Sequence, residues 1–145
     1  MANTHFRPKV PSRFGANPTF VSGAVAATAN TTVNTLVPVP KTKCFVSKVT
    51  ITLSTIGSDS DGTILLTPQI VATDGSTARD LASAVSLELN GVATALVPVA
   101  VTITATDGNR VLQEGETLRL KVVNNSAAID TAPVGYVSFD LLVQE

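Results

Sequence analysis

FVSKVTITLS, the stretch from residue 45 to residue 54, alternates apolar and polar side chains with a period of two. Such alternation is typical of a β-strand that covers a core on one face and leaves the other face exposed. The apolar face carries Phe45, Val49, Ile51 and Leu53, and the polar face carries Lys48, Thr50, Thr52 and Ser54. This stretch predicts a strand that is buried on one side.

The same alternation recurs along most of the chain, between stretches rich in Gly, Asn and Asp. It appears at residues 31–37, 64–72, 84–89, 99–105, 117–122 and 137–143. Seven or eight short strands separated by turns predict an all-β fold, an antiparallel β-sandwich of jelly-roll or immunoglobulin-like type. The turn at residues 57–62 also predicts that strands 45–54 and 64–72 pair as a hairpin.

Residues 78–89 allow two interpretations. Leu81, Ala84, Val85 and Leu89 have the spacing of a helical stripe, and residues 77–80 resemble a capping box. Against a helix, residues 85–89 alternate, and Asn90-Gly91 is a strong hairpin signal. We favour a strand at residues 84–89.

Size and composition indicate one domain. A chain of 145 residues can bury its own core, and here that core draws on Val, Ala, Leu and Ile rather than on aromatic residues, which make up 4%. Cys44 is the only cysteine, so the chain forms no internal disulfide, and we expect its thiol to be buried. The predicted organisation is an extended arm at residues 1–18 followed by a β-sandwich domain at residues 19–145.

The arm contains prolines at positions 8, 11 and 18 and shows no periodicity. Proline favours extended backbone in the residue before it, and polar terminal segments are ordered mainly where something holds them. We therefore expect the arm to lie on a neighbouring protein subunit. The candidate partner-binding residues are Phe6, Arg7, Lys9, Arg13 and Phe14.

Charge is distributed unevenly along the chain, although the net charge is only −1. Residues 1–58 contain six Lys or Arg and no acid, whereas residues 59–145 contain four bases and all eleven acids. A basic segment is attracted to acidic surfaces over about a Debye length. The partner's surface is expected to be acidic.

The residues that usually carry catalysis are sparse. The only histidine, His5, lies in the arm, so a nucleophile and base pair would depend on a terminal segment. The pairs Asp59/Asp61 and Glu114/Glu116 lie in glycine-containing turns, where we expect solvated carboxylates without partners. Asp59-x-Asp61-Gly62 matches only part of a calcium loop. We therefore predict no enzyme activity, no cofactor and no metal.

Two further partner classes are disfavoured. Arg7, Lys9 and Arg13 stand beside Phe6 and Phe14 in the arm, but stacking platforms for nucleic acid normally lie on a folded face, so we expect a protein partner instead. No apolar run approaches the ~20 residues that span a bilayer, and the start of the chain lacks the apolar stretch of a signal peptide. We expect the protein to be made in the cytoplasm and to bind neither nucleic acid nor membrane.

Three segments resemble one family of proteins. VSKVTIT at residues 46–52, VLQEGETLRL at residues 111–120 and GYVSFDL at residues 135–141 are similar to strands of the decoration, or cement, proteins of tailed-phage capsids, and more loosely to other β-sandwich virion proteins. The resemblance implies a structural protein on the capsid surface of a virion that binds the major capsid protein. It implies no catalytic residue.

Other functions remain open at this point. Within the structural class, the chain would also suit a head-fibre base, a tail component or a minor capsid component. A carbohydrate-binding module is an alternative of another class, although Tyr136 is the only tyrosine and tryptophan is absent. Exposed strand edges favour closure into a dimer or trimer.

Overall fold

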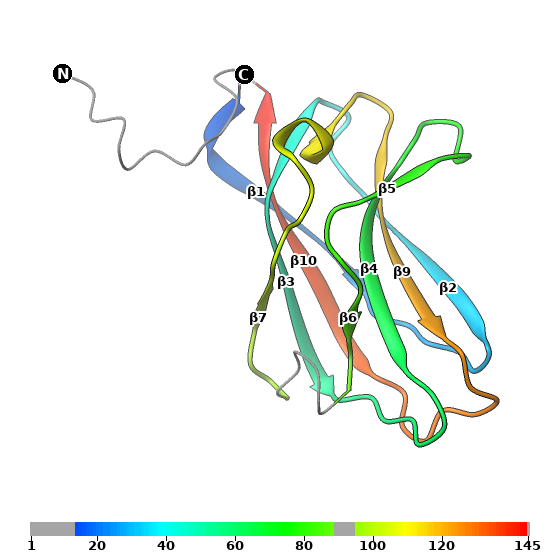
Figure 1. Cartoon of the computed structure of the whole chain (residues 1–145). Helices are drawn as coiled ribbons and strands as arrows, with labels where there is room; N and C mark the ends of the chain where they lie inside the picture. The colour runs from blue at the N-terminus through cyan, green and yellow to red at the C-terminus, as the bar shows by residue number, and fades with distance from the viewer. Residues whose placement is uncertain (1–13, 89–94, 145) are drawn as a thin grey trace.

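Two antiparallel sheets face each other in the computed structural model, which describes residues 14–88 and 95–144 (Figure 1). Sheet A has the order β1 (Phe14–Ala24), β10 (Val134–Gln144), β3 (Cys44–Thr55) and β7 (Val99–Val101), and β8 (Val111–Leu112) also pairs with β3. Sheet B has the order β2 (Thr31–Val37), β9 (Thr117–Asn124), β4 (Ile64–Val71) and β5 (Ala78–Asp80), and β6 (Val85–Ser86) also pairs with β4. A 3-10 helix, Asp107–Arg110, precedes β8. The predicted all-β antiparallel sandwich is confirmed.

The core lies between the sheets, on the faces that the period-two patterns predict. In β9 buried and half-buried residues alternate without a break, and in β3 the predicted apolar face is buried at Val49, Ile51 and Leu53. The prediction was wrong for Phe45: a register shift opposite Asp140 and Leu141 of β10 places Val46 in the core instead, and Phe45 lies in a separate cluster. Fully buried large side chains of this core come from both sheets, among them Ile51, Leu53, Phe139, Ile64, Leu66, Ile70, Leu118 and Leu120. Cys44 is buried as expected, and burial raises the pKa of its thiol. Small aliphatic side chains therefore fill most of the space between the sheets.

The predicted hairpin of strands 45–54 and 64–72 is wrong. β3 belongs to sheet A, where Val49 lies opposite Phe139 of β10. β4 belongs to sheet B, where Leu66 lies opposite Val122 of β9. The intervening segment 56–63 crosses from one sheet to the other, so the apolar faces of the two strands oppose each other across the core.

Residues 78–88 form two short strands rather than a helix. β5 and β6 both pair with β4, and the backbone N–H groups of Leu81 and Leu87 donate to the carbonyls of Pro68 and Ile64. The predicted strand is thus confirmed over Val85–Ser86, while residues 89–94, with Asn90-Gly91, lie outside the described residues. Pro68 lies between the parts of β4 that pair with β6 and with β5, where its missing N–H leaves no ladder bond broken.

Strand β1 has no counterpart among the predicted strands. It begins at Phe14, so the boundary expected between residues 18 and 19 falls inside a strand. β1 pairs with β10 from Phe14, opposite Gln144, to Ala24, opposite Tyr136, with a register shift between Phe14 and Pro18. The pairing with β10 stabilises β1 although its own sequence, with Gly, Asn and Pro, lacks alternation. In contrast, β7 is shorter than the predicted strand 99–105, and Ile103 lies beyond its end.

Candidate protein-binding site at the start of strand β1

The first described residue, Phe14, is packed against other strands of sheet A, apart from the main core. Its side chain is 7% exposed and lies in an apolar cluster with Phe45, Val111 and Leu142, which come from β3, β8 and β10. The rings of Phe14 and Phe45 have centroids 5.9 Å apart and planes tilted by 45°, a favourable geometry for an aromatic pair. We call these four residues the root cluster, because the predicted arm begins at this point.

Of the five candidate arm residues, the structure describes Phe14 alone. Phe6, Arg7, Lys9 and Arg13 lie outside the described residues. Phe14 belongs to the root cluster, so its ring is buried in the domain instead of being exposed as an anchor for a partner. Sequence patterns could not separate Phe6 from Phe14, because both stand beside an arginine in a proline-containing stretch.

Arg110 closes the root cluster from the outside. Its guanidinium carbon lies 4.6 Å from the centroid of the Phe45 ring, a cation–π contact. Nε and Nη2 donate to the carbonyls of Val46 and Ser47, each at 2.9 Å, and Nη1 lies 3.6 Å from Asp107. Burial lowers the pKa of Arg110, against the charge of Asp107, but guanidinium remains charged in proteins. The 3-10 helix is thereby held against β3.

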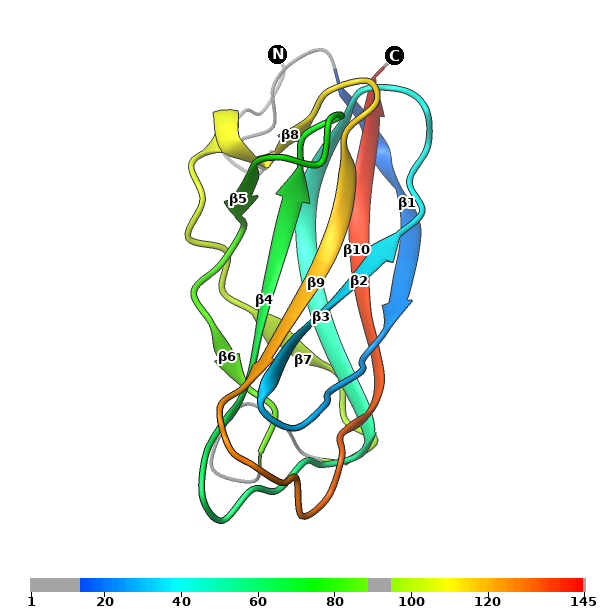
Figure 2. The same ribbon diagram turned by 90° about the vertical axis from the view of Figure 1, so that its right-hand side faces the viewer.

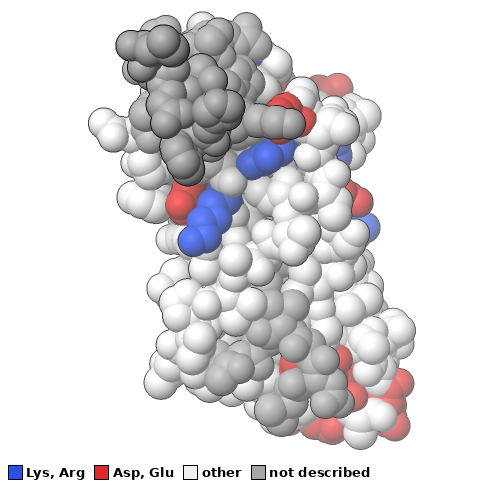
Figure 3. All heavy atoms as spheres, turned by 60° about the vertical axis from the view of Figure 1, so that its left-hand side comes forward, with Lys and Arg blue, Asp and Glu red and all other residues white. Residues whose placement is uncertain are grey.

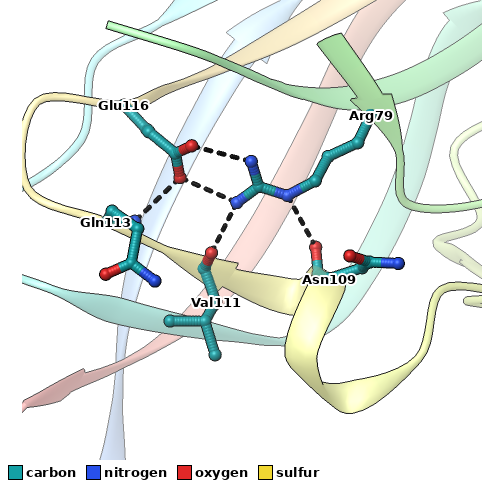
Figure 4. A network of polar contacts seen from close by, with 5 residues as sticks. All are labelled: Arg79, Asn109, Val111, Gln113 and Glu116. Carbon is teal, nitrogen blue, oxygen red and sulfur yellow. Dashed lines mark hydrogen bonds and ion pairs between the residues drawn. The ribbon is translucent and has the colours of Figure 1, made fainter.

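Arg79 and Glu116 hold the same loop from sheet B (Figure 4). Their two hydrogen bonds, Nη1 to Oε1 and Nη2 to Oε2, are both 2.7 Å long. Arg79 also donates to the carbonyls of Val111, at 2.6 Å, and Asn109, at 3.2 Å, while Glu116 accepts from the Gln113 N–H at 2.8 Å. The segment that carries Val111 into the root cluster is therefore fixed by both sheets.

These contacts correct the expected solvation of Glu116. Hydrogen bonds from Arg79, and the N–H of Gln113, hold the pKa of Glu116 below its usual value, although partial burial acts in the opposite direction. Glu114, in the same turn, is exposed. The expectation of a carboxylate without partners was thus wrong for Glu116. In the sequence, only the isolation of Arg79 pointed to this ion pair: it is the only Lys or Arg between Lys48 and Arg110.

An open hollow lies beside the root cluster. Its volume is about 400 Å³, and it is lined by Lys41, Thr42, Lys43, Gln113, Glu114 and Gln144. Gln144 is the residue paired with Phe14, and its N–H donates to the carbonyl of Lys43. The lining offers ammonium, carboxylate and carboxamide groups at the end of the sandwich where β1 begins. Such a surface suits polar contacts with a protein chain.

The opposite end of the sandwich carries the Asp59 turn. The Asp59 carboxylate accepts from Asn124 Nδ2 at 2.5 Å, from the hydroxyl of Ser126 and from the Asp61 N–H at 3.1 Å. Ser126 and Asn124 contribute most to lowering the pKa of Asp59. Asp59 therefore ties the β3–β4 crossing to the end of β9, and the expectation that it lacks partners was wrong. Across residues 14–88 and 95–144, no group of three or more His, Cys, Asp or Glu side chains could hold a metal ion.

The outer face of sheet A carries the pair Lys48 and Asp140, which lie opposite each other in β3 and β10. Figure 3 turns this side forward and shows Lys and Arg side chains in its upper half, acidic side chains at its lower end, and an uncoloured region between the two. Two aromatic side chains are exposed on it, Phe20 by 68% and Tyr136 by 47%. Phe20 lies opposite Asp140, and Tyr136 lies opposite Ala24.

Strands β1 and β2 contain no charged residue. Residues 14–40 include no Lys, Arg, Asp or Glu. β1 and β2 are the outermost strands of sheets A and B on this side and lie side by side (Figure 2). Leu36 of β2 is 62% exposed here. Charged residues commonly protect strand edges from association, so this side has the character of a contact surface.

Within the described parts of the chain, no helix is long and apolar enough to cross a membrane. Comparisons with protein-family models, with curated proteins and with solved structures found no match.

Proposed function

We propose that this chain is a structural subunit that binds the surface of a protein shell, in the manner of the decoration proteins of tailed-phage capsids. Residues 1–13 would hold the major capsid protein, and the sandwich would cover the shell. The observation that supports this proposal is that contacts with both sheets hold the root cluster in place. Arg110 ties the 3-10 helix to β3 of sheet A, and Arg79 of sheet B donates to Val111, so the residues before Phe14 leave from a defined point.

Fixation of the root favours binding because it limits the space that the arm explores. An arm tethered to a rigid point loses less conformational freedom when it binds than one tethered to a mobile loop. Arg7, Lys9 and Arg13 carry positive charge, and Phe6 supplies an apolar anchor. Charge would guide the approach to an acidic surface, whereas the buried aromatic ring would supply most of the affinity.

Co-sedimentation tests the proposal. Empty shells assembled from the major capsid protein of the same genome are mixed with the full chain, or with a chain that starts at Phe14, and separated on a density gradient. We expect the full chain to sediment with the shells in a fixed ratio and the shortened chain to stay unbound with an unchanged melting temperature. A full chain that stays unbound contradicts the proposal.

A matched pair of variants tests the role of charge. Arg7→Gln with Lys9→Gln removes two positive charges from the arm, and Lys48→Gln with Lys121→Gln removes two from the sheets. We expect only the arm variant to weaken binding and to reduce its dependence on salt. Equal losses in both variants would show that overall charge, rather than the arm, controls binding.

Carbohydrate binding is the second candidate, because Phe20 and Tyr136 are exposed on one face of sheet A. Aromatic rings on a flat sheet face can stack on sugar rings. A polysaccharide panel measured with the full chain and with the Tyr136→Ala variant distinguishes the two functions. Retention on a polysaccharide that is lost in the variant, together with no shell binding, would favour this candidate.

A further inference from the structure

Among the described residues, the outer edge of β1 has backbone groups without a strand partner at alternate positions. The N–H of Val25 donates to the carbonyl of Gly135 in β10 at 3.0 Å. In an antiparallel strand, alternate residues direct both backbone groups to the same side, so Thr19, Val21 and Gly23 also face β10. Phe20, Ser22 and Ala24 therefore direct their N–H and C=O groups away from β10. Among the described residues, β1 pairs with β10 alone.

Only the first half of this edge is protected against pairing. The register shift between Phe14 and Pro18 disturbs the strand there, and Pro18 has no N–H. From Thr19 to Ala24 the strand is regular and has neither charge nor proline. Natural strand edges usually carry such protection along their length. The unprotected half indicates that this edge is covered by another strand.

We propose that the covering strand is β1 of a second copy of this chain, paired antiparallel about a two-fold axis at Ser22. In this register Ser22 lies opposite Ser22 of the second copy, and Phe20 lies opposite Ala24 of the second copy. Three residues of each strand thereby exchange backbone hydrogen bonds. Sheet A becomes one continuous sheet through both copies. This inference does not depend on shell binding.

Pro18 selects this register. Pairing about Phe20 or Val21 would place Pro18 opposite Ser22 or Ala24, where one backbone acceptor would lack its donor. Pairing about Gly23 would place Phe20 opposite Ala26, which lies beyond the end of β1. The axis at Ser22 uses every free N–H of the unprotected half and leaves Pro18 outside the paired region.

Side chains on the outer face fit the same register. The side chains of Phe20, Ser22 and Ala24 are exposed, and Ala24 lies beside Tyr136 of β10. The large ring of Phe20 would lie next to the methyl group of Ala24 in the second copy. Tyr136 of the second copy would lie on the other side of that Ala24. Because residues 14–40 are uncharged, no like charges meet across the two β1 strands. A second copy is thus the partner whose shape and charge match this edge.

Sedimentation equilibrium of the full chain, from micromolar to near-millimolar concentration, tests the pairing. We expect a monomer–dimer equilibrium, and Ser22→Lys should abolish the dimer because it places two ammonium groups side by side at the axis. Ala100→Lys adds the same charge at the other edge of sheet A, in β7, and should leave the dimer intact. A wild-type chain that is monomeric at every concentration, or a Ser22→Lys dimer, overturns the proposal.

A cysteine cross-link tests the register independently of any effect of lysine on folding. Paired residues of this kind have Cα atoms ~5.5 Å apart, within the range that a disulfide spans. Ser22→Cys should oxidise to a covalent dimer, whereas Ala100→Cys should remain monomeric on a denaturing gel. The native Cys44 is buried and does not interfere. Equal cross-linking at both positions, or none at Ser22→Cys, contradicts the pairing.

Discussion

The rings of Phe14 and Phe45 lie with their centroids 5.9 Å apart and join the start of β1 to the start of β3. Phe14 is 7% exposed, so its truncation leaves a cavity in the root cluster. We predict that Phe14→Ala lowers the free energy of unfolding by about 3–5 kcal/mol. Urea denaturation followed by circular dichroism measures this loss.

Phe20 is the matched control for this prediction, because it lies in the same strand with 68% of its surface exposed. At concentrations where the chain is monomeric, Phe20→Ala should change the free energy of unfolding by less than about 0.5 kcal/mol. Similar losses at both positions would mean that the root cluster is not part of the cooperative core.

Glu116 should make stability depend on pH. Its pKa is lower in the folded chain than its usual value of 4.5, so folding favours the ionised carboxylate. The resulting stabilisation is complete above that value and is lost as the pH falls through the lower, folded pKa. We predict that Glu116→Gln costs about 1–3 kcal/mol at neutral pH and that the difference from wild type shrinks in acid. Urea titrations across the acidic range measure both effects.

Glu114 provides the control for Glu116 in the same turn. It is exposed, so Glu114→Gln should leave both the stability and its pH dependence close to those of the wild type. If the two variants behaved alike, the hydrogen bonds between Arg79 and Glu116 would contribute nothing measurable.

Asp59 and Asp61 should also differ, although they lie two residues apart. Asp59→Asn should lower the melting temperature, because both carboxylate oxygens accept hydrogen bonds and the amide NH2 group that replaces one of them cannot accept. Asp61 is exposed, and Asp61→Asn should have little effect. Thermal unfolding at neutral pH compares the two. A lower melting temperature in Asp61→Asn alone would reverse the assignment.

Truncation to Ala should lower the free energy of unfolding less at Ile103 than at apolar positions in the core. Ile51, Leu53, Leu120 and Phe139 are at most 2% exposed, and each change to Ala should cost about 2–5 kcal/mol. Ile103 only packs against the edge of the core, so Ile103→Ala should cost less than about 2 kcal/mol. Chemical denaturation of the five variants ranks them. An equal cost at Ile103 would place it inside the core.

Local patterns predicted the strands but not their partners. Burial of Ile51, Leu53 and Leu120 follows from alternation within a few residues, which depends on the pleat alone. The predicted hairpin of β3 with β4 was wrong because pairing depends on the whole sandwich, and the intervening turn permits either a hairpin or a crossing. β1 was missed because its stability comes from β10, at the other end of the chain.

The candidate site was less predictable than the fold. Arg79 meets Glu116 and Asp59 meets Asn124 across long separations in sequence, so no motif of fixed spacing could indicate them. Phe14 has an ordinary neighbourhood in the sequence, and only the folded position of Phe45 explains its burial. Phe6, Arg7, Lys9 and Arg13 stay predictions of the sequence.

The position of β10 between β1 and β3 imposes an order on biosynthesis. Strands β2, β4, β5, β6 and β9 of sheet B have all been translated once Asn124 has been added, so that sheet can assemble while the chain is still attached to the ribosome. Sheet A cannot be completed at that stage, because β10 lies between β1 and β3 and joins them. Until Gln144 emerges from the exit tunnel, β1 is exposed on the nascent chain as an uncharged strand without β10. The protein is most open to aggregation or chaperone capture during this interval.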